Sequence, residues 1–135
     1  MIEIAQFRRR ARLCLGTLAA KAIDVTVTLA GQSSAYWQGD HTQVFEANPL
    51  SLWLLQCGPR VYIAATIGWA LLTVAMLVLL PRGLAKVLAF AVIFGHAIGV
   101  ASWAIHGLGL LGFLACVPIL IGANRLLTWA WKEEA

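Results

Sequence analysis

Asp24 and His96 are ionisable residues that lie near the middle of two long apolar segments. An ionisable side chain inside a bilayer costs free energy unless it faces the interior of a helix bundle, so each of them marks a candidate site. At about 1.5 Å per helical residue, counting from Arg12 and from Leu84 places both at a similar depth, roughly 18 Å from the inner boundary. One hypothesis that follows is that their two helices pack together and bring the carboxylate and the imidazole into contact, which the shared depth permits but does not require.

Two kinds of chemistry use such a pair inside a membrane. Carboxylates and histidines bind transition metals such as zinc, manganese or iron, and Glu46 and His106 are then the candidate additional ligands. The same pair can instead relay a proton, as acidic residues and histidines do in membrane transporters. The structural alternative is that His96 is a hydrogen-bonded packing group. The sequence does not specify a metal or a substrate.

Haem is disfavoured as a cofactor. Its two candidate axial ligands, His96 and His106, lie ten residues apart in one predicted helix. That spacing separates them by about 15 Å along the helix axis, so one haem cannot use both.

The first apolar segment carries polar residues every three or four positions, which places them on one helical face that should point into the bundle. These residues are Thr17, Lys21, Asp24, Thr28 and Gln32. Lys21 precedes Asp24 by three positions, so the two are expected to form an ion pair. In that interpretation Asp24 is part of a neutralised structural pair.

A row of small residues borders His96 on the third apolar segment. It consists of Ala91, Gly95, Gly99 and Ser102. Small residues at such spacing let another helix approach closely in a membrane. The sequence therefore predicts a helix-packing surface beside His96.

The composition indicates an integral membrane protein. Of the 135 residues, 61% are hydrophobic and 12% are charged, whereas soluble domains average about 45–50% and about 25%. The formal net charge of +4 does not indicate a nucleic-acid partner, because the basic residues cluster at the ends of apolar segments. The length suits a single transmembrane bundle over residues 1–135.

The predicted fold class is all-α and polytopic, with four transmembrane helices and one short outer helix. A span needs about 20 mostly apolar residues, and four segments meet that requirement, at about 13–31, 61–80, 84–105 and 108–129. Tight turns are expected at Pro81-Arg82-Gly83 and at His106-Gly107.

The basic residues predict the orientation. If both termini are cytoplasmic, most of the Lys and Arg residues lie on that side, as the positive-inside rule requires. Those residues are Arg8, Arg9, Arg10, Arg12, Arg82, Lys86, Arg125 and Lys132.

The connection between the first two spans contains a predicted short helix at about 49–57. Asn48 is a suitable N-cap, Pro49 suits the first helical position and Gly58-Pro59 ends the helix. Glu46 and Asn48 are expected to support this cap. The helix is too short to span a bilayer, so it is either interfacial or re-entrant.

Around Asp24, Glu46-Ala47-Asn48-Pro49-Leu50 and Gly58-Pro59, the chain resembles a small uncharacterised family of bacterial four-helix integral membrane proteins. Members have an aspartate in the first helix and a Glu-x-Asn-Pro motif before a short helix. The resemblance covers about residues 20–105. It implies the same architecture in a bacterial inner (cytoplasmic) membrane, and it implies no reaction.

Common enzyme motifs are absent from the sequence, including Gly-x-Ser-x-Gly, His-Glu-x-x-His and the phosphate-binding glycine loop. An enzyme is therefore disfavoured. The expected function is an accessory or structural subunit of a larger membrane complex, in contact with the lipid bilayer and with other membrane subunits or copies of itself. The first alternative is a metal-binding or proton-relaying protein, possibly an enzyme, that uses Asp24 and His96 with Glu46. The second is a small oligomeric transporter.

Overall fold

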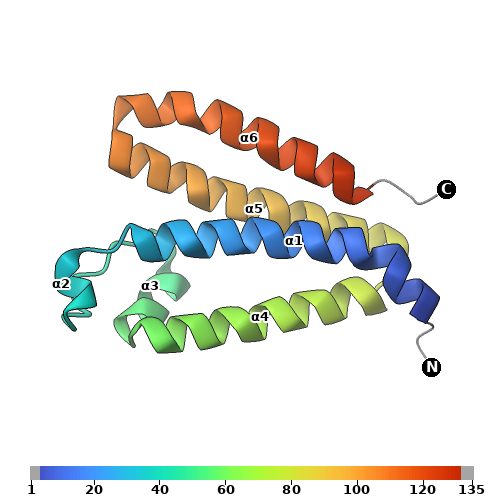
Figure 1. Ribbon diagram of the computed structural model, residues 1–135, viewed down its shortest axis with the longest axis horizontal. Coiled ribbons are helices and arrows are strands. Elements are labelled where there is room, and N and C mark those ends of the chain that lie inside the picture. The colour runs from blue at the N-terminus through green and yellow to red at the C-terminus, as the bar shows by residue number, and fades with distance from the viewer. Residues whose placement is uncertain (1–3, 132–135) are drawn as a thin grey trace.

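Helices make up almost all of the computed structural model, which describes residues 4–131, with side chains from Arg10 onward. Lys132 and the side chains of Arg8 and Arg9 therefore lie outside the described part. The helices are α1 (Ile4–Ala30), α2 (Ser34–Trp37), α3 (Pro49–Gln56), α4 (Pro59–Leu79), α5 (Arg82–Leu108) and α6 (Leu110–Trp131) (Figure 1). Four of them, α1, α4, α5 and α6, are long and apolar enough to cross a membrane. The predicted all-α, polytopic fold is confirmed, and the chain is a multi-pass membrane protein.

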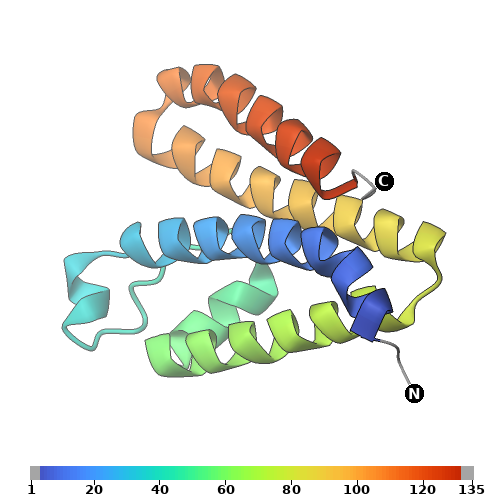
Figure 2. The ribbon, with the colours of Figure 1, turned by 45° about the vertical axis from the view of Figure 1, so that its right-hand side comes forward.

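Helix α1 is the centre of the bundle. It packs against α4 on one side and against the antiparallel hairpin of α5 and α6 on the other (Figures 1 and 2). The first residues of α1 and the last residues of α6 lie at the same end of the bundle, which we call the terminal end. The short helices α2 and α3 lie at the opposite end, which we call the loop end, and α3 packs against α4.

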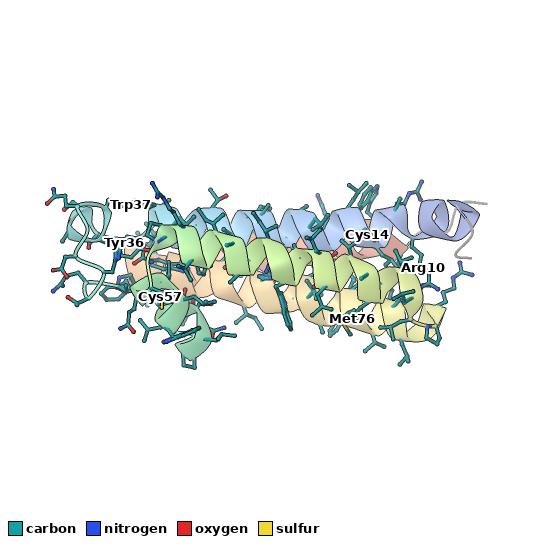
Figure 3. The ribbon with its side chains drawn as sticks, turned by 90° about the horizontal axis from the view of Figure 1, so that it is seen from below. Arg10, Cys14, Tyr36, Trp37, Cys57 and Met76 are labelled. Atoms are coloured by element: carbon teal, nitrogen blue, oxygen red, sulfur yellow. The ribbon has the colours of Figure 1, made fainter. Side chains whose placement is uncertain are left out.

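The first helix begins earlier than the apolar pattern predicts, at Ile4 instead of residue 13. Arg10 consequently lies on the helix, and its guanidinium donates hydrogen bonds to the carbonyl oxygens of Leu77 and Leu80 at the end of α4. The last carbonyls of a helix have no partner within it and carry partial negative charge, so a cation is favourable there. Arg10 thus ties α1 to α4 at the terminal end (Figure 3).

The turn between α5 and α6 lies further along the chain than predicted. Both His106 and Gly107 are helical, and α5 continues to Leu108. The chain reverses at Gly109, whose φ of +57° is readily adopted by glycine, and its N–H closes α5 on the carbonyl of Ile105. The prediction of a His106-Gly107 turn is therefore wrong. The inner turn is close to its predicted place, with Leu80 and Pro81 between α4 and α5.

The buried side chains form two clusters of different character. The larger one fills the terminal half of the bundle and is apolar, with many alanines that allow close helix packing. The smaller one, at the loop end, contains Tyr36, Leu55 and Tyr62. Tyr36 comes from α2, which the sequence did not predict, and its hydroxyl donates to the carbonyl of Leu55 at 3.2 Å. Burial raises the pKa of the Tyr36 phenol above its ordinary value.

Gly112 of α6 lies directly against the backbone of α5. A Cβ atom there would lie 2.3 Å from the carbonyl oxygen of Ala104 and 2.4 Å from the Cα of Ile105. We expect Gly112→Ala to lower the free energy of unfolding by about 1–3 kcal/mol, since backbone must move. Gly122→Ala is the matched control, because nothing lies within 4 Å of its added methyl. Unfolding in detergent micelles measures both, and an equally small effect at the two positions would contradict the packing.

Candidate functional site

Asp24 of α1 and His96 of α5 are in direct contact. The carboxylate Oδ2 and the imidazole Nδ1 are 2.7 Å apart, and about a fifth of each side chain is exposed. An ionised carboxylate can only accept hydrogen bonds, so Nδ1 is the donor whenever Asp24 is ionised. The shared depth calculated from the sequence therefore corresponds to a real contact between the two helices.

Gly99 makes room for this contact. A Cβ atom at Gly99 would lie 2.5 Å from Oδ1 of Asp24, so the carboxylate rests directly against the backbone of α5. Gly99 lies three residues after His96 and hence on the same face of the helix. A glycine at this position lets Asp24 reach the ring from α1.

The other small residues of the predicted packing surface do not contact α1 as Gly99 does. Ala91 and Gly95 line a cavity, and nothing lies within 4 Å of a Cβ added at Gly95. Ser102 is exposed, and its hydroxyl donates to the carbonyl of Gly99. The buried face of α5 is instead made by Ala85, Ala89, Ile93, Ala97 and Ala101. The row of small residues therefore does not pack against another helix along most of its length. Within the row, Gly99 makes the close contact.

The cavity beside the pair has a volume of about 700 Å³ and is bounded by α1, α3, α4, α5 and the segment before α3. A volume of this size is typical of small-molecule sites. Its wall includes polar side chains from four parts of the chain. They are Lys21, Asp24, Thr28, Glu46, Tyr62 and His96.

Lys21 is not the ion-pair partner that its spacing predicts. In the described residues, Asp24 is paired with His96, and no hydrogen bond or ion pair joins its carboxylate to Lys21. The reason is that Asp24 turns towards Gly99 and α5. Lys21 is nine-tenths buried and borders the same cavity. The predicted inward orientation of the polar face is confirmed by the burial of Thr17, Thr28 and Gln32.

Gln32 fixes the segment that carries Glu46, a role that the sequence analysis missed. Its side-chain amide donates to the carbonyl of Phe45 at 2.8 Å and accepts from the N–H of Phe45 at 3.0 Å. Two bonds from one amide hold the backbone at a single register. Gln32 is the last residue of the polar face, and this position could have indicated that its side chain bonds to the following loop.

The cap of α3 agrees with its prediction. Asn48 is the N-cap, its side-chain oxygen accepting from the N–H groups of Leu50 and Ser51, and Pro49 is the first helical residue. Glu46 supports the cap by accepting from the N–H of Asn48 at 2.8 Å. Because Glu46 also borders the cavity, the cap places a carboxylate at its loop-end side.

His106 lies away from the Asp24–His96 pair. Its ring stacks on Phe45 with centroids 4.0 Å apart, and it borders a second cavity of about 250 Å³ that also reaches Glu46. Among residues 4–131, no three His, Cys, Asp or Glu side chains are placed to hold a metal ion together. The four predicted ligands therefore do not form one coordination set.

Two aromatic residues of the cavity wall were missed as site residues. Tyr62 of α4 is 5% exposed and packs in the loop-end cluster. Trp103 lies against Gly31, where an added Cβ would be 2.3 Å from its ring. Their aromatic type alone did not distinguish an interfacial anchor from a cavity wall.

This arrangement is suited to proton exchange with a bound molecule, since a carboxylate–imidazole pair borders a space that can hold one. Comparisons with protein families, curated proteins and solved structures find no match to this chain.

We expect Gly99→Ala to separate Asp24 from His96, because the new methyl would occupy the place of Oδ1. The carboxylate is the end of a flexible side chain, so the fold should survive with a change in unfolding free energy within about 1 kcal/mol. Gly95→Ala, whose methyl meets nothing within 4 Å, should retain the contact. Nitrogen-15 NMR of the His96 ring reports the Nδ1 hydrogen bond. An unchanged spectrum in Gly99→Ala would contradict the geometry.

Proposed function

We propose that the protein binds a small molecule in the 700 Å³ cavity and exchanges a proton with it through the Asp24–His96 pair. The observation that carries the proposal is the 2.7 Å contact between Oδ2 and Nδ1 at the wall of that cavity. Intramembrane ionisable residues are functional by default, because burying them has a free-energy cost that packing alone does not require.

The two residues have different roles in this proposal. Asp24 holds the Nδ1 proton, which fixes the ring orientation and stabilises the imidazolium form when a second proton arrives. Nε2 is then the atom that accepts or donates the exchanged proton. The partial exposure of both side chains, 18% and 20%, lets a molecule in the cavity reach them.

The distribution of polar groups supports proton exchange from the loop end of the bundle only. The site opens in the loop-end half, whereas the terminal half is filled by the apolar cluster that includes Leu13, Leu77 and Leu127. A transporter would need a polar route through that half as well. The one-sided arrangement therefore favours a binding or acid–base site over the oligomeric transporter.

The accessory-subunit role stays a prediction from the sequence. Large apolar side chains such as Leu71, Leu72 and Val87 are exposed on the outside of the bundle. Lipid covers such surfaces as readily as protein does, so they favour neither lipid nor a partner subunit.

Replacing either member of the pair should abolish proton exchange at the site. For protein in lipid vesicles, infrared difference spectra between two pH values should show linked carboxylate and imidazole signals. Asp24→Asn should remove the first and alter the second, and His96→Gln should do the reverse, because the groups share a hydrogen bond.

Asp40→Asn is the matched control for that experiment. Asp40 is an exposed carboxylate that bonds to Thr42 and not to the site, so its loss should leave the linked signals unchanged. A pH-sensitive dye inside the vesicles should report no added proton flow. Linked signals that persist in both Asp24→Asn and His96→Gln would sink the proposal.

We also propose that the protein resides in a bacterial inner membrane with both termini cytoplasmic, as its resemblance to the small bacterial family implies. The basic residues support this orientation. Arg10, Arg12, Arg82 and Lys86 lie at or near helix ends at the terminal end, whereas Arg60 is the second residue of α4, at the loop end. Cytoplasmic ends attract such residues.

Cys57 provides a test of the orientation. It is exposed and lies at the loop end, while Cys14 is buried near Arg10 (Figure 3). A membrane-impermeant maleimide should label intact spheroplasts at Cys57, and Cys57→Ser should lose the label. Labelling that requires lysis of the cells would reverse the assigned orientation.

A further inference from the structure

Lys21 presents a charge to the cavity that the described residues do not satisfy. Its side chain is nine-tenths buried, and within residues 4–131 it makes no hydrogen bond or ion pair, although Asp24 attracts it electrostatically from a greater distance. Lysine is almost never buried without a partner. The side chain borders the cavity, so a bound molecule can supply the missing acceptor.

Part of the cavity wall is apolar. Leu50 and Leu54 of α3, Trp69 of α4 and Ala91 of α5 contribute to it. Trp69 is 59% exposed, Ala91 is exposed as well, and α4 and α5 contact each other at few positions. The cavity therefore has an apolar side between α4 and α5, at the level of the apolar surface that faces lipid.

We propose that the cavity binds an anionic amphiphile, whose phosphate or carboxylate group accepts hydrogen bonds from the Lys21 ammonium and whose apolar chain leaves between α4 and α5. This inference rests on the proposed function, since it assigns a ligand class to the same site. The acid group would lie beside His96, which would contribute a second cationic donor when protonated.

The other charges favour a ligand that arrives from the lipid. Four groups with readily charged side chains border the cavity: Lys21, Asp24, His96 and Glu46. Asp24 is hydrogen-bonded to His96, which balances its charge when the ring is protonated. Glu46 stands at the loop-end side, where it accepts a hydrogen bond from the N–H of Asn48. The negative charge of Glu46 repels free anions that approach from the loop end. An amphiphile can instead enter through the apolar side of the cavity and so avoid Glu46.

The test uses the full-length protein in dodecyl maltoside and follows the binding of dodecyl phosphate by native mass spectrometry. The detergent has the same alkyl chain without a charge, so measured binding reports the phosphate group. Lys21→Gln should weaken binding by about tenfold or more, the usual range for one charge-assisted hydrogen bond. Lys86→Gln is the matched control, because Lys86 lies near Trp131 at the terminal end and not at the cavity.

Three results would overturn the inference: an unchanged affinity in Lys21→Gln, an equal loss in Lys86→Gln, or displacement of dodecyl phosphate by an equal concentration of inorganic phosphate. Lys21→Arg should restore binding, which separates loss of charge from loss of fold. His96→Gln should retain most of the Lys21-dependent binding while losing the linked infrared signal. Failure of the ligand assignment is thus distinguishable from failure of the proton-exchange proposal.

Discussion

An ionised carboxylate in the middle of a helix bundle requires a partner, and the position of that partner constrains the rest of this structure. Asp24 finds it on α5, 72 positions along the chain. The contact requires α1 and α5 to approach until the carboxylate touches the backbone, and a glycine at position 99 permits that approach. Helix α4 packs on another side of α1, and the cavity lies between these elements. Burial of one charge and the shape of the cavity are therefore linked.

Much of the fold was predictable because membrane helices follow length, hydropathy and local capping rules. The four long helices were identified, and the cap formed by Asn48 and Pro49 was read from neighbouring residues. The shared depth of Asp24 and His96 was predictable, since helical rise is regular, whereas their contact also depends on which helices are neighbours and how each is rotated. The α5–α6 turn was misplaced because His106-Gly107 and Gly109 are equally plausible breaks in the sequence.

The details of the site depended on side-chain directions that spacing does not determine. Lys21 and Asp24 satisfy the rule for an ion pair three residues apart, yet the carboxylate turns to another helix. The Gln32–Phe45 bonds join positions 13 residues apart through an irregular loop, where no periodicity exists. The row containing Gly95 was interpreted as a contact surface, whereas small residues equally create a void when the facing helix lies further away.

The hydrogen bonds from Arg10 to the end of α4 have a mechanical consequence for the site. They join α1 and α4 at the terminal end, far from the cavity, while the loop ends of the same helices are connected through α2, α3 and the intervening segment. A change in the separation of α1 and α4 is thus a rotation about the Arg10 end, with the largest displacement at the loop end. Any change in the width of the cavity would therefore occur at the loop end, and the apolar terminal half of the bundle would stay closed.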